Sequence, residues 1–333
     1  MAQDPFHLRR HARLDAALVE REVRRFLAED IGRGDVTSER VVPRSAGAQA
    51  VMVAREACVL AGLPLAKAVF LAVDPGIVFS DRASDGDRVA AGAVLAHVEG
   101  PAGPILSGER VALNLVQRLS GIATLTRAYV DAIAGTGASV SDTRKTTPGL
   151  RVFEKYAVHV GGGRNHRMGL DDAILIKDNH RAIAGGAAAA VTAARQAGGD
   201  GMPVQIEVDA LADLPRVFDL GVEAVLLDNM TPAQAAEAVK LARAHPRGRD
   251  CWIEASGGIT LDTIRAYAEA GVDTISVGAL THSARAVDIA LDITVPGGAG
   301  QPCRAAKPTC SSSAAASQGA RPRSRPPAAA PAC

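Results

Sequence analysis

Between Ala138 and Leu280, short apolar runs alternate with polar stretches, and each run ends on a charged, hydroxyl or glycine residue. With their endings they read ASVSDTRKT, AILIKDNH, VQIEVDA, AVLLDN, CWIEASGG and TISVGAL. Most runs precede a segment with helical spacing, which predicts a parallel sheet of alternating strands and helices. In a parallel barrel, all strand ends that precede helices lie on one face. The pattern therefore predicts that these residues converge: Arg144, Lys145, Lys177, Glu207, Asp228, Ser256, Gly257, Gly258 and Gly278.

The first part of the chain has a different pattern. Residues 14–28 have apolar positions at helical spacing, whereas residues 48–103 follow the pattern of strands. Residues 104–133 predict a long helical region that Gly121 could interrupt. The stretch DGDRVAAGAVLAHVEG resembles the hammerhead hairpins of lipoyl and biotinyl carrier domains, but it has no lysine for attachment. We interpret it as scaffold.

Composition and charge exclude some classes of function. Hydrophobic residues make up 47% of the 333 residues and aromatic residues only 3%, so aliphatic side chains must fill the core. A surface that stacks nucleic-acid bases usually needs aromatic side chains, so this composition argues against one. The formal net charge is +1, but residues 296–333 hold five of the 37 basic residues and no acid. The remaining 32 basic and 36 acidic residues give −4, so the positive charge around residues 144–181 indicates a small-anion site rather than a nucleic-acid or membrane surface.

The cysteines and the termini point to an ordinary cytoplasmic protein. The five cysteines show no metal-ligand or CxxC spacing, and three lie after residue 295. The N-terminal residues contain no signal-peptide core, and no apolar run approaches membrane-spanning length. Residues 296–333 are rich in Pro, Ala, Ser and Arg, so we expect a disordered, solvated extension rather than a basic tail for an acidic partner. Arg33-Gly34-Asp35 is read as a turn rather than an adhesion signal.

The segment SDTRKTTPG carries Arg144 and Lys145 side by side, and Pro148 fits the first turn of a following helix. Cations are unfavourable at a helix N-terminus, so the pair predicts an anion nearby; a solvated basic pair is the alternative. The next polar segment, GGGRNHRMGLDDAILIKDNH, adds His166, Arg167 and Lys177. Lys177 could contact phosphate, form a Schiff base or be merely exposed. We expect His159 to be structural, and Asn165, Asp178, Asn179 and His180 to satisfy loop backbone groups.

Glu207 and Asp228 end two successive apolar runs. Paired carboxylates suit Mg²⁺, which prefers oxygen ligands and often bridges carboxylates to substrate phosphates. Alternatively, they balance the lysines as ion pairs, and Asp209 could join them or start the next helix. The late segments EASGGIT and SVGALTHS are typical of phosphate-binding turns, because small residues let backbone N–H groups approach the ligand.

These segments, together with LSGERVALNLVQRLSGIATLT, IEVD, LLDN and EDIGRGDVTS, resemble the quinolinate phosphoribosyltransferase family, also called nicotinate-nucleotide pyrophosphorylase (carboxylating). The resemblance runs from about Leu14 to Ile293. It implies an α/β fold, in which an N-terminal α/β sandwich (hammerhead-like) domain is joined to an incomplete, open α/β barrel. The corresponding ranges are 1–120 for the first domain, 121–282 for the barrel, 283–295 for a segment that returns to the first domain, and 296–333 for the tail.

The resemblance also implies roles for single residues. Arg144, His166, Arg167 and Lys177 match the quinolinate pocket, and Thr143 and Lys145 belong to the substrate site. Lys145, Glu207 and Asp228 are the expected catalytic residues, and Glu207 and Asp228 the expected Mg²⁺ ligands, directly or through water or substrate. Ser256, Gly257, Gly258, Ser276, Val277 and Gly278 match the phosphate loops. Arg110 is expected to reach the neighbouring site of a homodimer or of a hexamer built from dimers.

The family converts quinolinate and phosphoribosyl pyrophosphate to nicotinate mononucleotide, pyrophosphate and CO₂ with Mg²⁺, in NAD biosynthesis. We expect the same of this chain, with no organic cofactor, nucleic acid or membrane as a partner. Three alternatives remain. They are a paralogue that acts on another aromatic acid, such as the homologues linked to molybdenum uptake, a Schiff-base aldolase that uses Lys177, and a non-catalytic carrier module built on the hammerhead-like hairpin.

Overall fold

The computed structural model describes residue 5, residues 14–197 and residues 201–294, and all of these belong to one compact unit. Predictions that concern residues 295–333, including the disordered tail, fall outside the described residues. The first part of the chain forms α1 (Ala16–Ile31), α2 (Val36–Val41), β1 (Gly47–Ala54), β2 (Cys58–Val59), α3 (Leu63–Val73), β3 (Val78–Asp81), β4 (Arg88–Val89), β5 (Val94–Pro101) and α4 (Ala102–Ala132).

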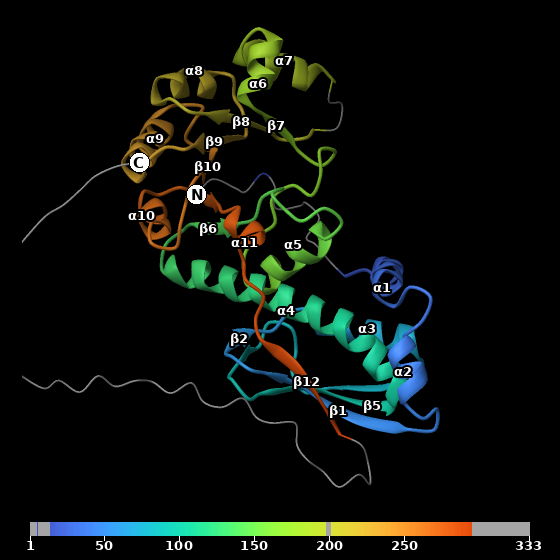
Figure 1. Ribbon diagram of the computed structural model, residues 1–333. Coiled ribbons are helices and arrows are strands. Elements are labelled where there is room, and N and C mark those ends of the chain that lie inside the picture. The colour runs from blue at the N-terminus through green and yellow to red at the C-terminus, as the bar shows by residue number, and fades with distance from the viewer. Residues whose placement is uncertain (1–4, 6–13, 198–200, 295–333) are drawn as a thin grey trace, which may run out of the picture. The chain divides into compact units, whose positions relative to one another are not determined.

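The second part alternates strands and helices (Figure 1). Its elements are β6 (Ser139–Ser141), α5 (Arg151–Val160), β7 (Ile174–Ile176), α6 (Asp178–Ala184), α7 (Ala187–Ala197), β8 (Val204–Val208), η1 (Leu211–Asp213), α8 (Leu214–Asp219), β9 (Ala224–Asp228), α9 (Pro232–Ala244), β10 (Trp252–Ser256), α10 (Ile264–Glu269), β11 (Thr274–Ser276), α11 (Ala279–His282) and β12 (Ile289–Thr294).

The first sheet is antiparallel, in the order β12-β1-β5-β3, and β2 and β4 form a separate pair. Buried residues recur at every second position of β1, from Ala48 to Ala54. Successive side chains of a strand point to opposite faces, so one face of this sheet is covered and the other is more open. β12, the last described strand, pairs with β1, so the chain returns to its first sheet after the second is complete.

The second sheet is parallel, in the order β6-β11-β10-β9-β8-β7. All five residues of β8 are buried, as expected for a parallel strand covered on both faces. β6 and β7 do not pair with each other, and Arg164 forms a single bridge to Ser141 on the free side of β6. The barrel is therefore open between its two outer strands, and the predicted fold class is confirmed.

α4 runs without interruption from Ala102 to Ala132, so the predicted break at Gly121 is wrong. The glycine is needed there for a different reason. A Cβ atom at Gly121 would lie 1.9 Å from the carbonyl oxygen of Arg285, in the segment that leads to β12. Only a residue without a side chain allows the returning chain to cross the helix at this distance.

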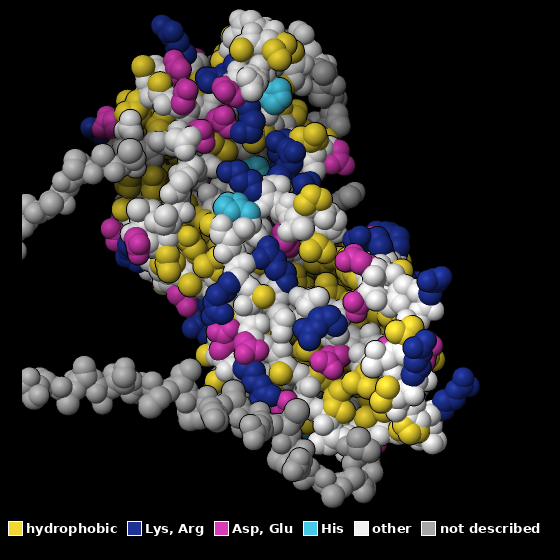
Figure 2. Space-filling view, viewed as in Figure 1, with side chains coloured by type: hydrophobic (Ala, Val, Ile, Leu, Met, Phe, Trp, Pro, Cys, Tyr) yellow, Lys and Arg dark blue, Asp and Glu magenta, His cyan; other side chains and the backbone are white. Residues whose placement is uncertain are grey.

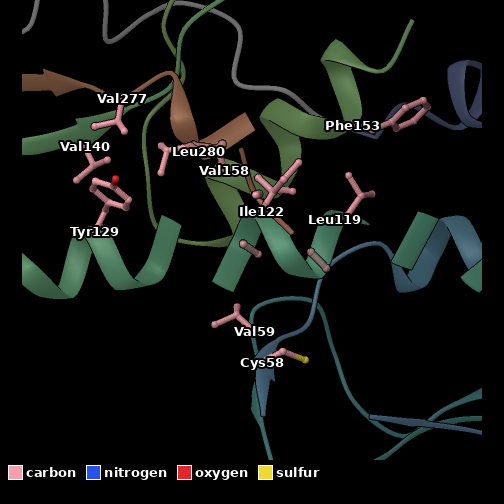
Figure 3. Close-up of a cluster of buried hydrophobic side chains, with 14 of the residues drawn as sticks. Cys58, Val59, Leu119, Ile122, Tyr129, Val140, Phe153, Val158, Val277 and Leu280 are labelled. Carbon is pink, nitrogen blue, oxygen red and sulfur yellow. The ribbon is translucent and has the colours of Figure 1, made fainter. Parts of the chain in front are cut away.

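The apolar core is continuous through both sheets because α4 lies between them (Figure 3). Leu119 and Ile122 of α4 lie in one buried cluster with Val59 of β2, Val140 of β6 and Val277, which directly follows β11. The domain boundaries proposed from the sequence stay a prediction. Among the described residues, no helix combines the length and the apolar character that crossing a bilayer requires.

Candidate active site

The carboxyl ends of four parallel strands lie in register. Ser141 of β6 is opposite Ser276 of β11, which is opposite Ser256 of β10, and Ser256 is opposite Asp228 of β9. We call this edge of the sheet, with the loops that follow β6 to β11, the mouth. Figure 2 shows Lys, Arg and His side chains close together in the upper middle of the view, between the places that Figure 1 labels β7 and α11.

Two carboxylates and a lysine meet at the mouth. Glu207 is buried, one residue before the end of β8, and accepts a hydrogen bond from Lys177, which caps the start of α6. Burial and then the charge of Glu207 raise the pKa of Asp228, and the charges of Lys177 and Lys145 oppose this rise. The ion-pair interpretation is therefore confirmed for Glu207, whereas the Mg²⁺ interpretation stays a prediction. Asp209 is exposed, 3.8 Å from Arg181, and precedes η1.

Arg144 and Lys145 lie in the loop after β6, but α5 begins only at Arg151. The prediction that the pair stands at a helix start, with Pro148 in the first turn, is wrong. Glu154 of α5 accepts hydrogen bonds from the backbone N–H and hydroxyl of Thr147, at 3.0 and 2.9 Å, and this holds a turn ahead of the helix. Within that loop Thr143 accepts a hydrogen bond from the backbone N–H of Lys145.

The second cationic loop carries His166 and Arg167. Arg167 is only 8% exposed and donates to the carbonyl oxygen of Ala173, and burial and the nearby charge of Arg144 lower its pKa. The buried Nε of Arg144 has no hydrogen-bond partner within the described chain. Two partly desolvated guanidinium groups thus lie near enough to repel each other. An anion placed between them would relieve both the repulsion and the missing hydrogen bond.

The glycine turns leave room at the mouth. Gly257 has φ +102°, and a Cβ there would lie 2.1 Å from Oδ1 of Asn229, whereas Gly258 has φ +60° and open space beside it. Gly278 precedes α11, and a Cβ there would come within 3.0 Å of Cδ of Lys145. Val277 is buried beneath this turn. Bare backbone beside a lysine is what a phosphate group requires, although α11 itself is too short to contribute much of a helix dipole.

The sequence analysis missed Glu254, a buried carboxylate in the middle of β10. It accepts hydrogen bonds from Gln205 and Ser276, at 2.7 and 2.5 Å, and lies 3.4 Å from Nε2 of His166. Burial tends to raise the pKa of Glu254, but the charge of His166 and these hydrogen bonds bring it below its usual range. The available signal was a glutamate inside the otherwise apolar strand CWIEA, where a charge needs partners.

Other predicted residues lie away from this cluster. Arg110 is exposed on the first half of α4, next to Glu109, whose pKa burial raises and the Arg110 charge lowers. His159 is exposed on α5, and its structural role stays a prediction. Asp35 of the RGD turn accepts hydrogen bonds from the N–H groups of Thr37 and Ser38 and caps α2, which accounts for it without any ligand.

The residues at the mouth fit a divalent cation only in part. Asp228 lies close enough to Glu207 for the second carboxylate to raise its pKa, and a cation beside it would offset that repulsion. Among the described residues, however, no three or more His, Cys, Asp and Glu side chains gather as a metal site. Mg²⁺ here would therefore need most of its oxygen ligands from water or substrate, as is usual for this ion.

The fold is that of an open α/β barrel, and cations, acids and glycine turns gather at its mouth. Family models described as "Quinolinate phosphoribosyl transferase, N-terminal domain" and "C-terminal domain" match residues 35–120 and 122–292. The "Probable nicotinate-nucleotide pyrophosphorylase (carboxylating)" of Bacillus subtilis is 43% identical over 270 residues, which cover 81% of this chain and 91% of that protein. The chain belongs to the quinolinate phosphoribosyltransferase family.

Further relatives agree with this assignment. The "Nicotinate-nucleotide pyrophosphorylase (carboxylating)" of Mycobacterium leprae is 45% identical over 275 residues, covering 81% of this chain and 95% of that protein. The structure of the nicotinate-nucleotide pyrophosphorylase from Francisella tularensis aligns with a TM-score of 0.81 at 38% identity, covering 86% of this chain and all of that one.

Proposed function

We propose that this protein transfers the phosphoribosyl group of phosphoribosyl pyrophosphate to quinolinate and decarboxylates the product. The products are nicotinate mononucleotide, pyrophosphate and CO₂, and the reaction belongs to NAD biosynthesis. The observation that carries the proposal is the pair of partly buried guanidinium groups, Arg144 and Arg167, on the edge of the sheet that also carries Glu207 and Asp228. Membership of the family supports the same reaction.

Quinolinate is a dianion with adjacent carboxylates. Arg144, with an unused buried donor, can bind one carboxylate through two parallel hydrogen bonds, and Arg167 and His166 can bind the other. Positive charge fixed before the substrate arrives orients the ring without further rearrangement. The pyridine nitrogen would then face the ribose.

Positive charge develops at the anomeric carbon as the bond to pyrophosphate breaks. Glu207 and Asp228 place negative charge near that carbon, and Lys145 lies against the Gly278 turn where phosphate oxygens would bind. Bound Mg²⁺, held through Glu207, Asp228 and substrate oxygens, would supply charge neutralisation of the leaving pyrophosphate. Asp228 must be ionised for this role, so the cations Lys145 and Lys177, which lower its pKa, assist it.

The second step needs no further group. The new bond between the pyridine nitrogen and ribose makes the ring cationic. When the carboxylate next to that nitrogen leaves as CO₂, the electron pair remains on the ring carbon, which the adjacent cationic nitrogen stabilises. A proton then takes the place of the CO₂, and nicotinate mononucleotide results.

The test is incubation of the folded protein with quinolinate, phosphoribosyl pyrophosphate and Mg²⁺, followed by chromatography of the products. Nicotinate mononucleotide and pyrophosphate should appear in equal amounts. A screen of other aromatic acids decides between this reaction and that of a paralogue with a different acceptor. A folded protein that yields no product with quinolinate, but does with another acid, would overturn the proposed substrate.

A Schiff-base aldolase fits the mouth less well. Lys177 donates a hydrogen bond to Glu207, and this contact would have to break before the amine could attack a carbonyl group. Borohydride trapping with carbonyl substrates should therefore leave the mass of the protein unchanged. A stable adduct at Lys177 would instead support that reaction.

We also propose a cytoplasmic homodimer in which Arg110 completes the site of the other subunit. In support, Arg110 is exposed on α4 and belongs to the motif that resembles the family. Mixing two inactive variants, Arg110→Ala and Arg144→Ala, and allowing subunit exchange should restore activity, because one site of each hybrid dimer contains both arginines. If Arg110 acts within its own chain, mixing should restore nothing. Sedimentation would distinguish a dimer from a hexamer.

A further inference from the structure

Two adjacent charged residues of α5 are fully buried, and neither has a place in the proposed chemistry. Glu154 and Lys155 are both 0% exposed. Each contacts one end of the loop that carries Arg144 and Lys145, since Lys155 pairs with Asp142 and Glu154 binds Thr147. Helix α5 therefore binds this loop at both of its ends.

The contact at the start of the loop also reaches the second cationic loop. Asp142 is 0% exposed and accepts hydrogen bonds from the side chain of Asn165 at 2.7 Å and from the backbone N–H of His166 at 2.8 Å, besides its bond from Lys155. Lys155 in turn donates to the carbonyl oxygen of His166 at 3.0 Å. The buried ion pair thus holds His166 by both of its backbone polar groups and joins the two loops.

The contact between Glu154 and Thr147, at the end of the loop, is also held by further hydrogen bonds. Besides its two bonds from Thr147, Glu154 accepts a hydrogen bond from Arg118 of α4 at 2.9 Å. Arg118 also donates to the carbonyl oxygens of Thr281 and Ala284, in and just beyond α11. The rear of the loop is therefore fixed to two further helices rather than to solvent.

The cations on these loops repel one another. The charge of Arg144 lowers the pKa of Arg167, so the two guanidinium groups are near enough to repel each other. Loops that carry repelling charges would move apart unless their backbones were fixed. A buried ion pair contributes little to stability compared with apolar residues of the same volume, so a pair in this position calls for another explanation.

We propose that Glu154 and Lys155, with Asp142, are positioning residues that fix the spacing of Arg144, His166 and Arg167 for the two adjacent carboxylates of the acceptor. This inference rests on the proposed function. They touch neither substrate, and they act by holding the backbones of both loops. Binding of quinolinate should depend on them. Phosphoribosyl pyrophosphate meets only Lys145 on these loops, and the carbonyl oxygen of Lys145 also accepts a hydrogen bond from Thr281 of α11 at 2.8 Å, so its binding should change little.

The test compares Lys155→Met, Asp142→Asn and the double variant by calorimetric titration with quinolinate and with phosphoribosyl pyrophosphate, each with a thermal unfolding curve. Each single variant leaves a buried charge without its partner, so the melting temperature falls and the quinolinate Kd rises at least tenfold. The double variant removes both charges, so its melting temperature recovers while the quinolinate Kd stays at least fivefold weaker. In all of these variants the Kd for phosphoribosyl pyrophosphate changes less than twofold.

The double variant separates positioning from simple stabilisation, because recovery of quinolinate binding together with the melting temperature would overturn the proposal. If Lys155→Met or Asp142→Asn does not fold, Glu154→Gln provides the same test at the other end of the loop, with an expected fivefold loss of quinolinate affinity. Asp273→Asn is the matched control, a part-buried acid that accepts from Arg243 and from the backbone N–H of Ile253. It should lower the melting temperature and leave the quinolinate Kd unchanged.

Binding of quinolinate to the unmodified protein separates a failure of the proposed function from a failure of the positioning role. If it fails to bind quinolinate, the proposed function fails and the positioning role for that acceptor fails with it. If it binds quinolinate and the variants bind equally well, only the positioning role is overturned.

Discussion

At the amino ends of the parallel strands, charged groups are matched to partners. Asp273, just before β11, accepts hydrogen bonds from Arg243 and from the backbone N–H of Ile253, at 2.9 and 2.8 Å. Glu223, just before β9, accepts one from the backbone N–H of Val204 at 2.7 Å. At the carboxyl ends the same residue types face like charges, since Arg144 lowers the pKa of Arg167 and Glu207 raises that of Asp228.

This difference indicates what each end of the barrel is for. Charges at the amino ends stabilise the fold, because each satisfies a backbone group or an opposite charge. At the carboxyl ends, some like charges stay close to each other, which costs stability, and under the proposed function a bound ligand would offset this cost. Barrels of this kind place ligands at the carboxyl ends of their strands, which supports the same location here.

The largest expected effect comes from removing a cation at the mouth. Arg144→Ala should lower kcat/KM for quinolinate. The loss should correspond to about 2–4 kcal/mol of transition-state stabilisation, because a charge-assisted contact in a desolvated site is lost. The Kd for phosphoribosyl pyrophosphate should change far less. Arg195→Ala, near the opposite end of the strands, is the matched control, because within the described chain Arg195 donates to the carbonyls of Leu220 and Gly221 and to Glu223, all at that end. Equal losses for both ligands in calorimetry would contradict the role assigned to Arg144.

The complementary change at the amino ends should affect stability instead. Asp273→Asn should lower the free energy of unfolding by about 1.5–3 kcal/mol, the usual size for hydrogen bonds to a charged group. Urea unfolding measures this loss. The rate per folded molecule with quinolinate should stay the same. A fall in kcat without a loss of stability would show that the two ends are not as separate as the comparison holds.

A smaller effect is expected from pH at the mouth. The pKa of Asp228 lies above 3.8, so the folded state holds that proton more tightly than the unfolded chain does. Its contribution to stability is therefore present at low pH and is lost as pH rises through the raised pKa. Mg²⁺-dependent binding of phosphoribosyl pyrophosphate needs the ionised form and should strengthen over the same acid range.

Two variants test whether Asp228 sets the pH midpoint of phosphoribosyl pyrophosphate binding. Glu207→Gln removes a charge that raises the pKa of Asp228, so the binding midpoint should move to lower pH. Lys177→Met removes one that lowers it, so the midpoint should move to higher pH. Calorimetric titrations across the acid range measure both. Midpoints that move in the same direction in both variants would exclude Asp228 as the titrating group.

The smallest effect is expected from an exposed ion pair outside the parallel sheet, between Glu56 and Arg285. Arg285, and then the backbone N–H of Asp288, lower the pKa of Glu56 to about 2. Its contribution to stability is therefore complete above the ordinary value of 4.5 and is lost as pH falls toward 2. Because the Arg285 side chain is 72% exposed, solvent screens the pair, and Glu56→Gln should barely change urea unfolding at pH 7. A large loss there would mean that surface pairs contribute more than the matched pairs of the barrel.

The strand ends were the part of the site that the sequence could predict. Asp228, Ser256 and Ser276 each end an apolar run, and parallel strands bring such ends together whatever the connecting helices do. The start of α5 was not predictable in this way. Pro148 fits a helix start locally, but hydrogen bonds from Thr147 to Glu154 keep the chain in a turn until Leu150.

Alternation of apolar and polar positions by itself determined the parallel sheet, the long helix and the residues gathered at the mouth, because these depend on short-range periodicity. Only the tertiary structure decided why Gly121 is a glycine, which carboxylate faces His166, and how Lys155 and Glu154 hold the cationic loops. Each of these depends on groups that lie far apart along the chain or in different elements, such as the Arg285 carbonyl beside Gly121. The pattern along a chain records which residues are buried, whereas their partners are set by how the elements pack.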